Sequence, residues 1–259
     1  THALLKRLPK VELHCHLDGS LRVETVFDLA QKDNIELPAS NIDYLRKALI
    51  IGDKRGSLED YIKRFDITLS VMQTPESLER CAYELIEDVA AENVRYIEIR
   101  YSPILHTAEE MTMGESIEAV QHGLKNGEKD FGVRSGIIIC GIRHISPEAS
   151  LKLADIAVRY KNKGVVGFDL AGAEENFPAK KHREAFYQIR NNNINSTIHA
   201  GEAFGPASIH QAIHYCGANR IGPPVKNRHC TLPLDVSSAV TLSFTMEGTK
   251  TVSPITTGS

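Results

Sequence analysis

Several features that mark particular protein classes are absent from this 259-residue sequence. No apolar run approaches the ~20 residues that cross a bilayer, so we expect no membrane span. The net charge of −3 gives no reason to expect a nucleic acid or an anionic membrane as a partner. No G-x-G-x-x-G motif follows an expected strand, so the usual dinucleotide-binding fingerprint is missing.

Cysteine is scarce and scattered. The chain has five cysteines, an odd number without a C-x-x-C pair, at Cys15, Cys81, Cys140, Cys216 and Cys230. This pattern disfavours a disulfide framework and favours a reducing compartment. Residues 1–7 are too short and too charged for a signal peptide, so we expect a cytoplasmic protein. The first residue is not Met, which we interpret as a processed or trimmed start.

The chain alternates strand-like and helix-like segments. We expect strands at 11–17, 94–101, 135–141, 164–171 and 196–200, with another beginning at 219. We expect helices at 22–33, 42–49, 57–70, 75–91, 114–128, 147–160, 180–191 and 206–216. Repeated β-α units predict a parallel sheet with crossover helices. The length fits one large domain and favours a (β/α)8 barrel over an open doubly wound sheet.

The most informative short motif is V-E-L-H-C-H-L-D-G, which contains His14 and His16. In a strand, residues i and i+2 point to the same side, so both imidazoles face one way, with Asp18 next on that side. Two imidazoles held in this way make half of a metal site. An ordinary pair of buried core histidines explains the spacing about equally well.

Polar residues recur at the carboxyl ends of the expected strands, the face where barrel enzymes build their active sites. They are His14, His16, Asp18, Arg100, Tyr101, Ser102, Arg143, His144, Gly172, His199 and Glu202. His199 would supply a third metal ligand, and Glu202 is placed to act as a general acid or base. The alternatives are a buried His199 bonded to backbone, and a Glu202 that is only a solvated loop residue or helix cap.

Four motifs together resemble the adenosine deaminase family of the amidohydrolase superfamily. They are H-C-H-L-D-G-S-L at 14–21, R-Y-S-P at 100–103, D-L-A-G at 169–172 and H-A-G-E at 199–202, and the likeness runs from about Leu8 to Gly222. The resemblance implies a metal-dependent barrel and zinc-assisted hydrolysis of adenosine to inosine and ammonia. It also implies a small-molecule purine nucleoside as the binding partner.

The same resemblance implies roles for individual residues. His14, His16 and His199 would hold zinc, and Glu202 would protonate the purine ring nitrogen N1. Gly172 would donate its backbone N–H to the ring, and Asp18 would bond the ribose 5′-hydroxyl. A helix with Leu58, Tyr61, Ile62 and Phe65 matches the family's hydrophobic gate, although an ordinary amphipathic core face explains its periodicity as well.

The family pattern changes after Gly222. The family continues with His-Gly and later with Thr-Asp-Asp, whereas this chain continues with Pro223-Pro224-Val225 and has no such acidic pair. We therefore expect residues 1–222 to form a partial barrel of five to six strands, followed by a divergent tail at 223–259. A shifted reading frame, an alternative splice product or an incomplete gene model would produce such a change. The missing groups position the attacking water, so we expect little or no activity from the chain as written.

Two other functions remain open. One is a neighbouring purine deaminase acting on adenine or adenosine monophosphate, although a carboxylate at Asp18 would repel a phosphate. The other is a non-catalytic product, either a purine-binding remnant or a misfolded truncated chain, because an unclosed barrel leaves sheet edges open.

Overall fold

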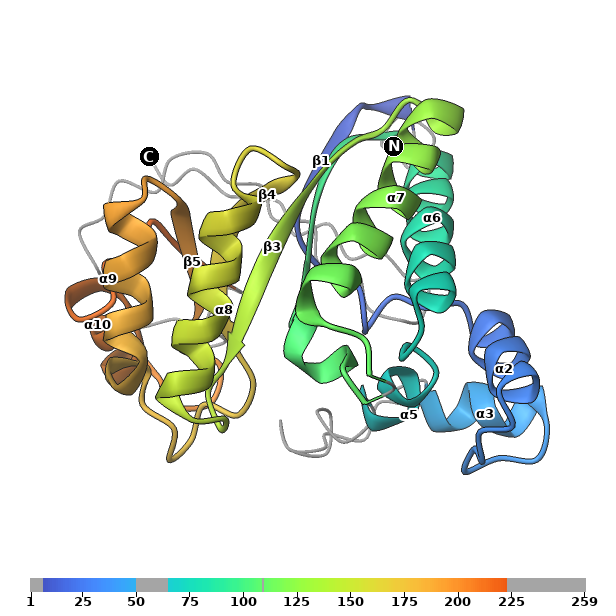
Figure 1. Ribbon diagram of the computed structural model, residues 1–259, viewed down its shortest axis with the longest axis horizontal. Coiled ribbons are helices and arrows are strands. Elements are labelled where there is room, and N and C mark those ends of the chain that lie inside the picture. The colour runs from blue at the N-terminus through green and yellow to red at the C-terminus, as the bar shows by residue number, and fades with distance from the viewer. Residues whose placement is uncertain (1–6, 50–64, 109, 223–259) are drawn as a thin grey trace, which may run out of the picture.

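The computed structural model describes residues 7–49, 65–108 and 110–222. Within them six strands form one sheet in the order β1-β2-β3-β4-β5-β6, and every neighbouring pair is parallel. The strands are β1 (Lys10–His16), β2 (Val94–Tyr101), β3 (Arg134–Ile142), β4 (Val165–Ala171), β5 (Asn195–His199) and β6 (Arg220–Gly222). Because strand order follows chain order throughout, the sheet is a curled part of a (β/α) barrel (Figure 1).

Helices connect the strands and cover the outer face of the sheet (Figure 1). Those between β1 and β2 are α2 (Val23–Lys32), α3 (Ile42–Leu49), α5 (Phe65–Ser70) and α6 (Pro75–Ala91). The later ones are η1 (Pro103–His106), α7 (Met113–Phe131), α8 (Pro147–Tyr160), η2 (Ala179–His182), α9 (Arg183–Asn191) and α10 (Pro206–His214). None of the described helices is long and apolar enough to cross a membrane.

Alternation along the strands separates an apolar outer face from a polar inner one. On β2, Ile97 and Ile99 are fully buried in the hydrophobic core formed with the helices. Their neighbours Glu98 and Arg100 carry the charges, and each is bonded to a residue of another strand. Because successive side chains of a strand point to opposite faces, the inner face receives the polar set.

Two close approaches across the inner face show that the sheet is strongly curled. Arg220 on β6 donates to Glu98 on β2, with 2.5 Å between Nη2 and Oε2. A Cβ added at Gly222 would lie 2.5 Å from Cε1 of His14 on β1. Real Cβ atoms do not approach other atoms this closely, so glycine is required where β6 passes the His14 ring.

Local sequence signals explain where the main helices begin. Thr74 caps α6 through a reciprocal capping box with Ser77, and Pro75 occupies the first turn. Thr112 caps α7 in the same way with Glu115. The helix ends at Gly132, whose φ of 72° lies in the left-handed region that glycine adopts at little cost.

The expected strands and most helices are confirmed, and the differences lie at segment ends. The expected helix at 180–191 is divided into η2 and α9, because buried His182 is tied to the Ser150 side chain and to the Arg143 carbonyl. The expected helix at 206–216 ends at His214, before Gly217 with a φ of 66°. Of the expected helix at 57–70, residues 57–64 lie outside the described part of the chain.

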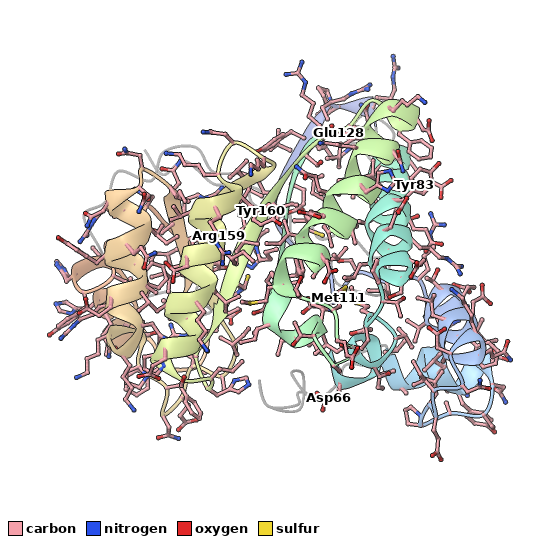
Figure 2. The ribbon with its side chains drawn as sticks, viewed as in Figure 1. Asp66, Tyr83, Met111, Glu128, Arg159 and Tyr160 are labelled. Carbon is pink, nitrogen blue, oxygen red and sulfur yellow. The ribbon has the colours of Figure 1, made fainter. Side chains whose placement is uncertain are left out.

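Helices α6 and α7 pack at very short range. A Cβ added at Gly123 would lie 2.2 Å from the carbonyl oxygen of Glu79, and one at Gly127 would lie 2.7 Å from Ile86 Cβ. Tyr83, on the outer side of α6 in Figure 2, donates to Asp130 of α7 at 3.0 Å. The two glycines therefore let the two helix backbones approach each other. At the surface, the Tyr83–Asp130 hydrogen bond also joins α6 to α7.

We predict that Gly123→Ala destabilises the chain. Overpacking costs about 1–3 kcal/mol, which exceeds the gain of about 1 kcal/mol from alanine's helix propensity. Lys125→Ala, on the exposed side of the same helix, is the control and should change stability by no more than about 0.5 kcal/mol. Urea unfolding midpoints measure both, and an unchanged midpoint for Gly123→Ala would contradict the close packing.

Candidate metal centre and purine site

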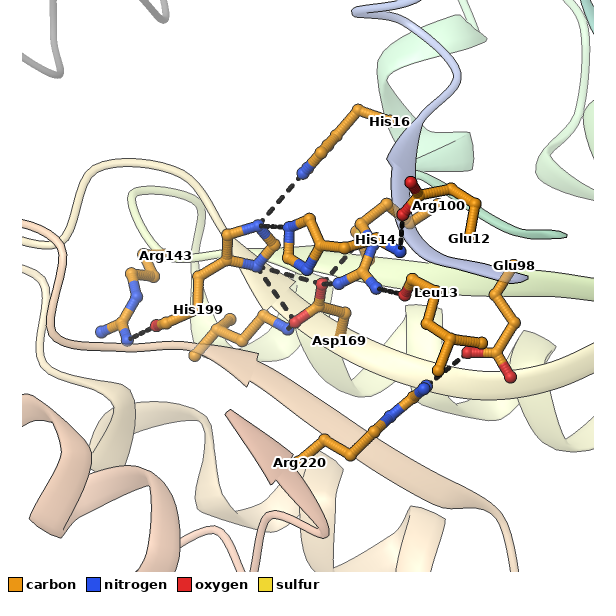
Figure 3. Close-up of polar contacts among 12 residues, drawn as sticks. Glu12, Leu13, His14, His16, Glu98, Arg100, Arg143, Asp169, His199 and Arg220 are labelled. Carbon is orange, nitrogen blue, oxygen red and sulfur yellow. Dashed lines mark hydrogen bonds and ion pairs between the residues drawn. The ribbon is translucent and has the colours of Figure 1, made fainter. Parts of the chain in front are cut away.

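Three imidazoles from two strands that are far apart in the sheet order, β1 and β5, converge at the carboxyl edge of the sheet. The Nε2 atom of His199 on β5 lies 2.9 Å from Nε2 of His14 and 3.0 Å from Nε2 of His16, both on β1 (Figure 3). The three nitrogens lie within 4.8 Å of one another, and they make up the group of potential metal ligands found among the described residues. The expectation that His14 and His16 face one way is therefore confirmed.

The donor set suits a divalent cation. Burial lowers the pKa of His14 to about 2 and that of His16 well below its ordinary value, with further lowering from His199 and Arg100. Both rings are therefore neutral near pH 7. The Nδ1 atom of His199 lies 3.0 Å from a carboxylate oxygen of Asp169, so we assign its proton to Nδ1 and a lone pair to Nε2. Neutral imidazole lone pairs that meet at one point are what zinc requires.

Arg100 ties the two halves of this centre together. Its guanidinium forms an ion pair with Asp169 and donates at 2.6 Å to the carbonyl of Leu13, the residue before His14. Both side chains of the ion pair are almost entirely buried, at 1% and 0% exposure. Burial opposes ionisation of Asp169, but His199 and Arg100 outweigh it and hold the pKa of this carboxyl well below its usual range.

Asp18 lies beside the imidazoles, as the sequence spacing indicates. Its Oδ1 atom is 3.9 Å from Nδ1 of His16. The side chain is buried, and burial raises its pKa to about 7. Oδ1 has no hydrogen-bond partner among the described residues. A buried oxygen without a hydrogen-bond partner costs free energy of folding. This atom therefore has the capacity to accept a hydrogen bond from the hydroxyl group of a ligand.

Gly172 and Glu202 lie on the loops that follow β4 and β5. Gly172 has a φ of 91°, and a Cβ there would lie 3.2 Å from atoms of His144 and Ile142. Any residue with a side chain would therefore be strained at this position. Glu202 reaches the solvent-exposed surface of its loop, but protein atoms partly enclose its carboxyl. Desolvation by the surrounding protein, Glu174 and Asp169 together outweigh the attraction of His199 and raise the pKa of its carboxyl. A carboxyl with a raised pKa is suited to donate a proton.

The predicted hydrophobic gate can be followed only in part. Leu58, Tyr61 and Ile62 lie outside the described residues. Phe65, at the start of α5, has its ring 6.2 Å from the His16 ring, and it lies against Gly19. The end of the expected gate helix therefore approaches the candidate metal centre.

Three residues that shape the centre received no role from the sequence. Asp169 holds His199, Arg100 holds Asp169, and buried Arg143 donates to the carbonyl of His199 at 2.5 Å (Figure 3). A charged residue inside an otherwise apolar strand is a signal for such a role, and Asp169 in V-V-G-F-D-L-A carries it. Arg143 was marked only by its place after a strand, among the polar residues at the carboxyl ends, and that place did not indicate a contact with His199.

Comparison with known proteins agrees with this centre. The family model described as adenosine deaminase matches residues 9–229, which is more than half of the chain and extends past the Gly222 limit expected above. The chain belongs to the adenosine deaminase family. Adenosine deaminase from Mycobacterium leprae is 43% identical over 228 residues, covering 86% of this chain and 62% of that protein. A protein from Dictyostelium discoideum named probable adenosine deaminase is 43% identical over 219 residues, covering 85% of this chain and 28% of that protein.

Solved structures of related proteins have the same fold as this chain. Adenine deaminase from Arthrobacter aurescens superposes with a TM-score of 0.74 at 27% identity, covering 82% of this chain and 63% of that one. An amidohydrolase from Burkholderia ambifaria with bound Zn gives a TM-score of 0.77 at 27% identity, covering 85% of this chain and 59% of that one. The chain thus spans less than two thirds of the length of these relatives.

We predict that Arg100→Met destabilises the chain strongly. The change leaves the Asp169 carboxylate buried without its cation, which typically costs about 3–5 kcal/mol. Arg183→Met is the matched control, because Arg183 pairs with Glu184 on the surface, where such a pair is worth at most about 1 kcal/mol. Chemical unfolding measures both, and equal losses would contradict the role assigned to the buried pair.

Proposed function

We propose that this chain carries the metal-binding and purine-contacting part of a hydrolytic adenosine deaminase. The observation that supports this most is the convergence of three imidazole nitrogens, with His199 held by Asp169 and with Glu202 on the loop that follows His199. Zinc is the proposed metal because imidazole is a preferred zinc ligand and a structural relative is described with bound Zn. When bound, zinc would lower the pKa of a water molecule to about 7 and supply hydroxide near neutral pH.

The chain's own residues would bind and polarise the purine. Glu202 would protonate the ring nitrogen N1, which makes the neighbouring C6 more electrophilic, and its raised pKa supports that role. Gly172 would donate its backbone N–H to the ring. Asp18 would accept the ribose 5′-hydroxyl at its Oδ1 atom, which has no partner among the described residues. His14, His16 and His199 would hold the metal.

Adenosine is the substrate that the chemistry favours over adenine or adenosine monophosphate. Structural relatives include an adenine deaminase and an Arabidopsis protein described in complex with GMP and with IMP. The carboxyl of Asp18 would repel the phosphate of a nucleotide once ionised, and it would lack its ribose partner with adenine. The curated relatives at 42–43% identity carry the name adenosine deaminase. For location, the four cysteines in the described part of the chain are free and buried, which supports a reducing, cytoplasmic compartment.

The rate should be lower than a complete set of catalytic groups would give. Residues 223–259, which we propose as a tail separate from the unit at 1–222, lack the His-Gly and Thr-Asp-Asp motifs. Each positioned acid–base group typically contributes ~10²–10⁴ in rate. The residual rate would come from the imidazoles and Glu202, which are present.

We predict slow formation of inosine and ammonia from adenosine by the zinc-loaded chain, followed by the change in ultraviolet absorbance. Glu202→Gln should lower this rate by ~10²–10⁴, because it removes the proposed proton donor. Glu184→Gln, an exposed change on α9, should leave the rate unchanged. Removal of the metal with a chelator should stop turnover, and zinc should restore it.

Absence of any inosine above the Glu202→Gln background would contradict the proposed function. A rate typical of complete relatives would instead contradict the expected deficit while leaving the proposed reaction intact. Competition among adenosine, adenine and adenosine monophosphate would decide the substrate.

A further inference from the structure

A second carboxylate, Glu174, is buried behind the loop that carries Glu202. Glu174 follows β4 and is 3% exposed. Its oxygens accept backbone N–H groups from Gly201 at 2.5 Å, from Ala203 and from Phe204 at 3.0 Å. Charge-assisted hydrogen bonds are among the strongest in proteins, and one carboxylate here receives three from a single loop.

These bonds bracket Glu202. The Gly201 N–H belongs to the peptide unit before Gly201, and the Ala203 N–H belongs to the unit that follows Glu202. Both units are therefore fixed by the same side chain. Gly201 has a φ of 93° and Gly205 a φ of 64°, so the loop contains two residues that rotate easily. Without an anchor, this backbone would leave the direction of the Glu202 side chain poorly defined.

The surroundings of Glu174 keep its carboxyl charged. The Ser208 hydroxyl, on α10, favours the charged form of Glu174 and so helps to lower the pKa of its carboxyl. Ser208 also lies 3.4 Å from a guanidinium nitrogen of Arg143, the residue that donates to the His199 carbonyl. Burial opposes ionisation of Glu174, but Ser208 and the bonds from the loop amides outweigh it and lower the pKa of the carboxyl. The acceptor is thus charged near neutral pH.

The three hydrogen bonds from Gly201, Ala203 and Phe204 to Glu174 form what we call the Glu174 clamp. The position of Glu174 along the chain shows which two loops this clamp joins. Glu174 lies two residues after Gly172, so its backbone continues the β4 loop, while its carboxylate holds the β5 loop. The two groups proposed to contact the purine ring, the Gly172 N–H and the Glu202 carboxyl, stand on these two loops. The pairing of β4 with β5 sets the approximate separation of these two groups, and the Glu174 side chain adds a direct link between their loops.

We propose that Glu174 is a positioning residue, which holds Glu202 at the correct distance and angle from the purine that Gly172 contacts. This inference rests on the proposed deaminase function. Glu174 does not touch the substrate in this account and acts only through the Glu202 loop. Small misplacements of a reacting group are costly, since about 1 Å of error lowers the rate by about 10²-fold.

The test compares Glu174→Gln with Glu175→Gln in the full zinc-loaded chain. The first change keeps the side chain's size but removes its charge and one acceptor oxygen. The second makes the same chemical change on the neighbouring exposed residue. Three readouts are needed: amide hydrogen exchange of residues 201–204, kcat and KM for adenosine separately, and zinc content.

For Glu174→Gln we expect faster exchange at 201–204, a fall in kcat of about 10- to 10²-fold and a smaller change in KM, with zinc content retained. Glu175→Gln should match the unmodified chain in all three. Glu174→Asp, which keeps the charge on a shorter side chain, should recover part of kcat. Unchanged kcat with faster exchange, or a loss of zinc that accounts for the loss of rate, would overturn the positioning role.

The proposed function and this inference fail in different ways. If the unmodified chain forms no inosine, the proposed function is wrong, and the catalytic part of the inference is overturned with it. The clamp itself is judged by amide exchange alone. Slow exchange at 201–204 that does not respond to Glu174→Gln would overturn the clamp, whatever the activity of the chain.

Discussion

A guanidinium enclosed by a curled sheet has to be neutralised by a partner that is equally enclosed, and in this chain Arg100 and Asp169 satisfy that requirement. The remaining hydrogen bonds of the pair reach the two places that matter most. Asp169 faces the Nδ1 atom of His199, and Arg100 donates to the carbonyl beside His14. Loss of this one pair would free both sides of the candidate metal centre. The cost of burying two charges is thus offset by the order that they impose on three imidazoles.

Buried charged side chains also hold the loops of the site, as Arg100 and Asp169 hold its strands. Arg143 holds the carbonyl of His199 and lies near Ser208, whose hydroxyl helps to lower the pKa of Glu174. Glu174 in turn holds the loop with Glu202. The groups proposed to act on a purine therefore stand on loops, and buried Glu174 ties the loop with Glu202 to the loop that follows β4. Such preorganisation allows loop residues to act with the precision of residues on regular elements.

Much of the fold could be predicted from the sequence, because β-α alternation and helix caps are local signals. Thr74-Pro75 and the apolar stretch at 135–141 each specify their own element. The division at His182 could not be predicted, because it depends on contacts with distant residues such as Ser150. The same contrast holds for the site. His14 and His16 are two residues apart and visible as a motif, whereas the bonds of Glu174 to Gly201 join loops 27 residues apart.

Whether His14, His16 and His199 form one metal centre can be measured directly by X-ray absorption at the zinc edge of the zinc-loaded chain. We expect three imidazole nitrogens at about 2.0–2.1 Å from the metal, and one fewer in His199→Ala. A sulfur ligand at about 2.3 Å, or an imidazole count that does not fall in His199→Ala, would contradict this three-histidine centre.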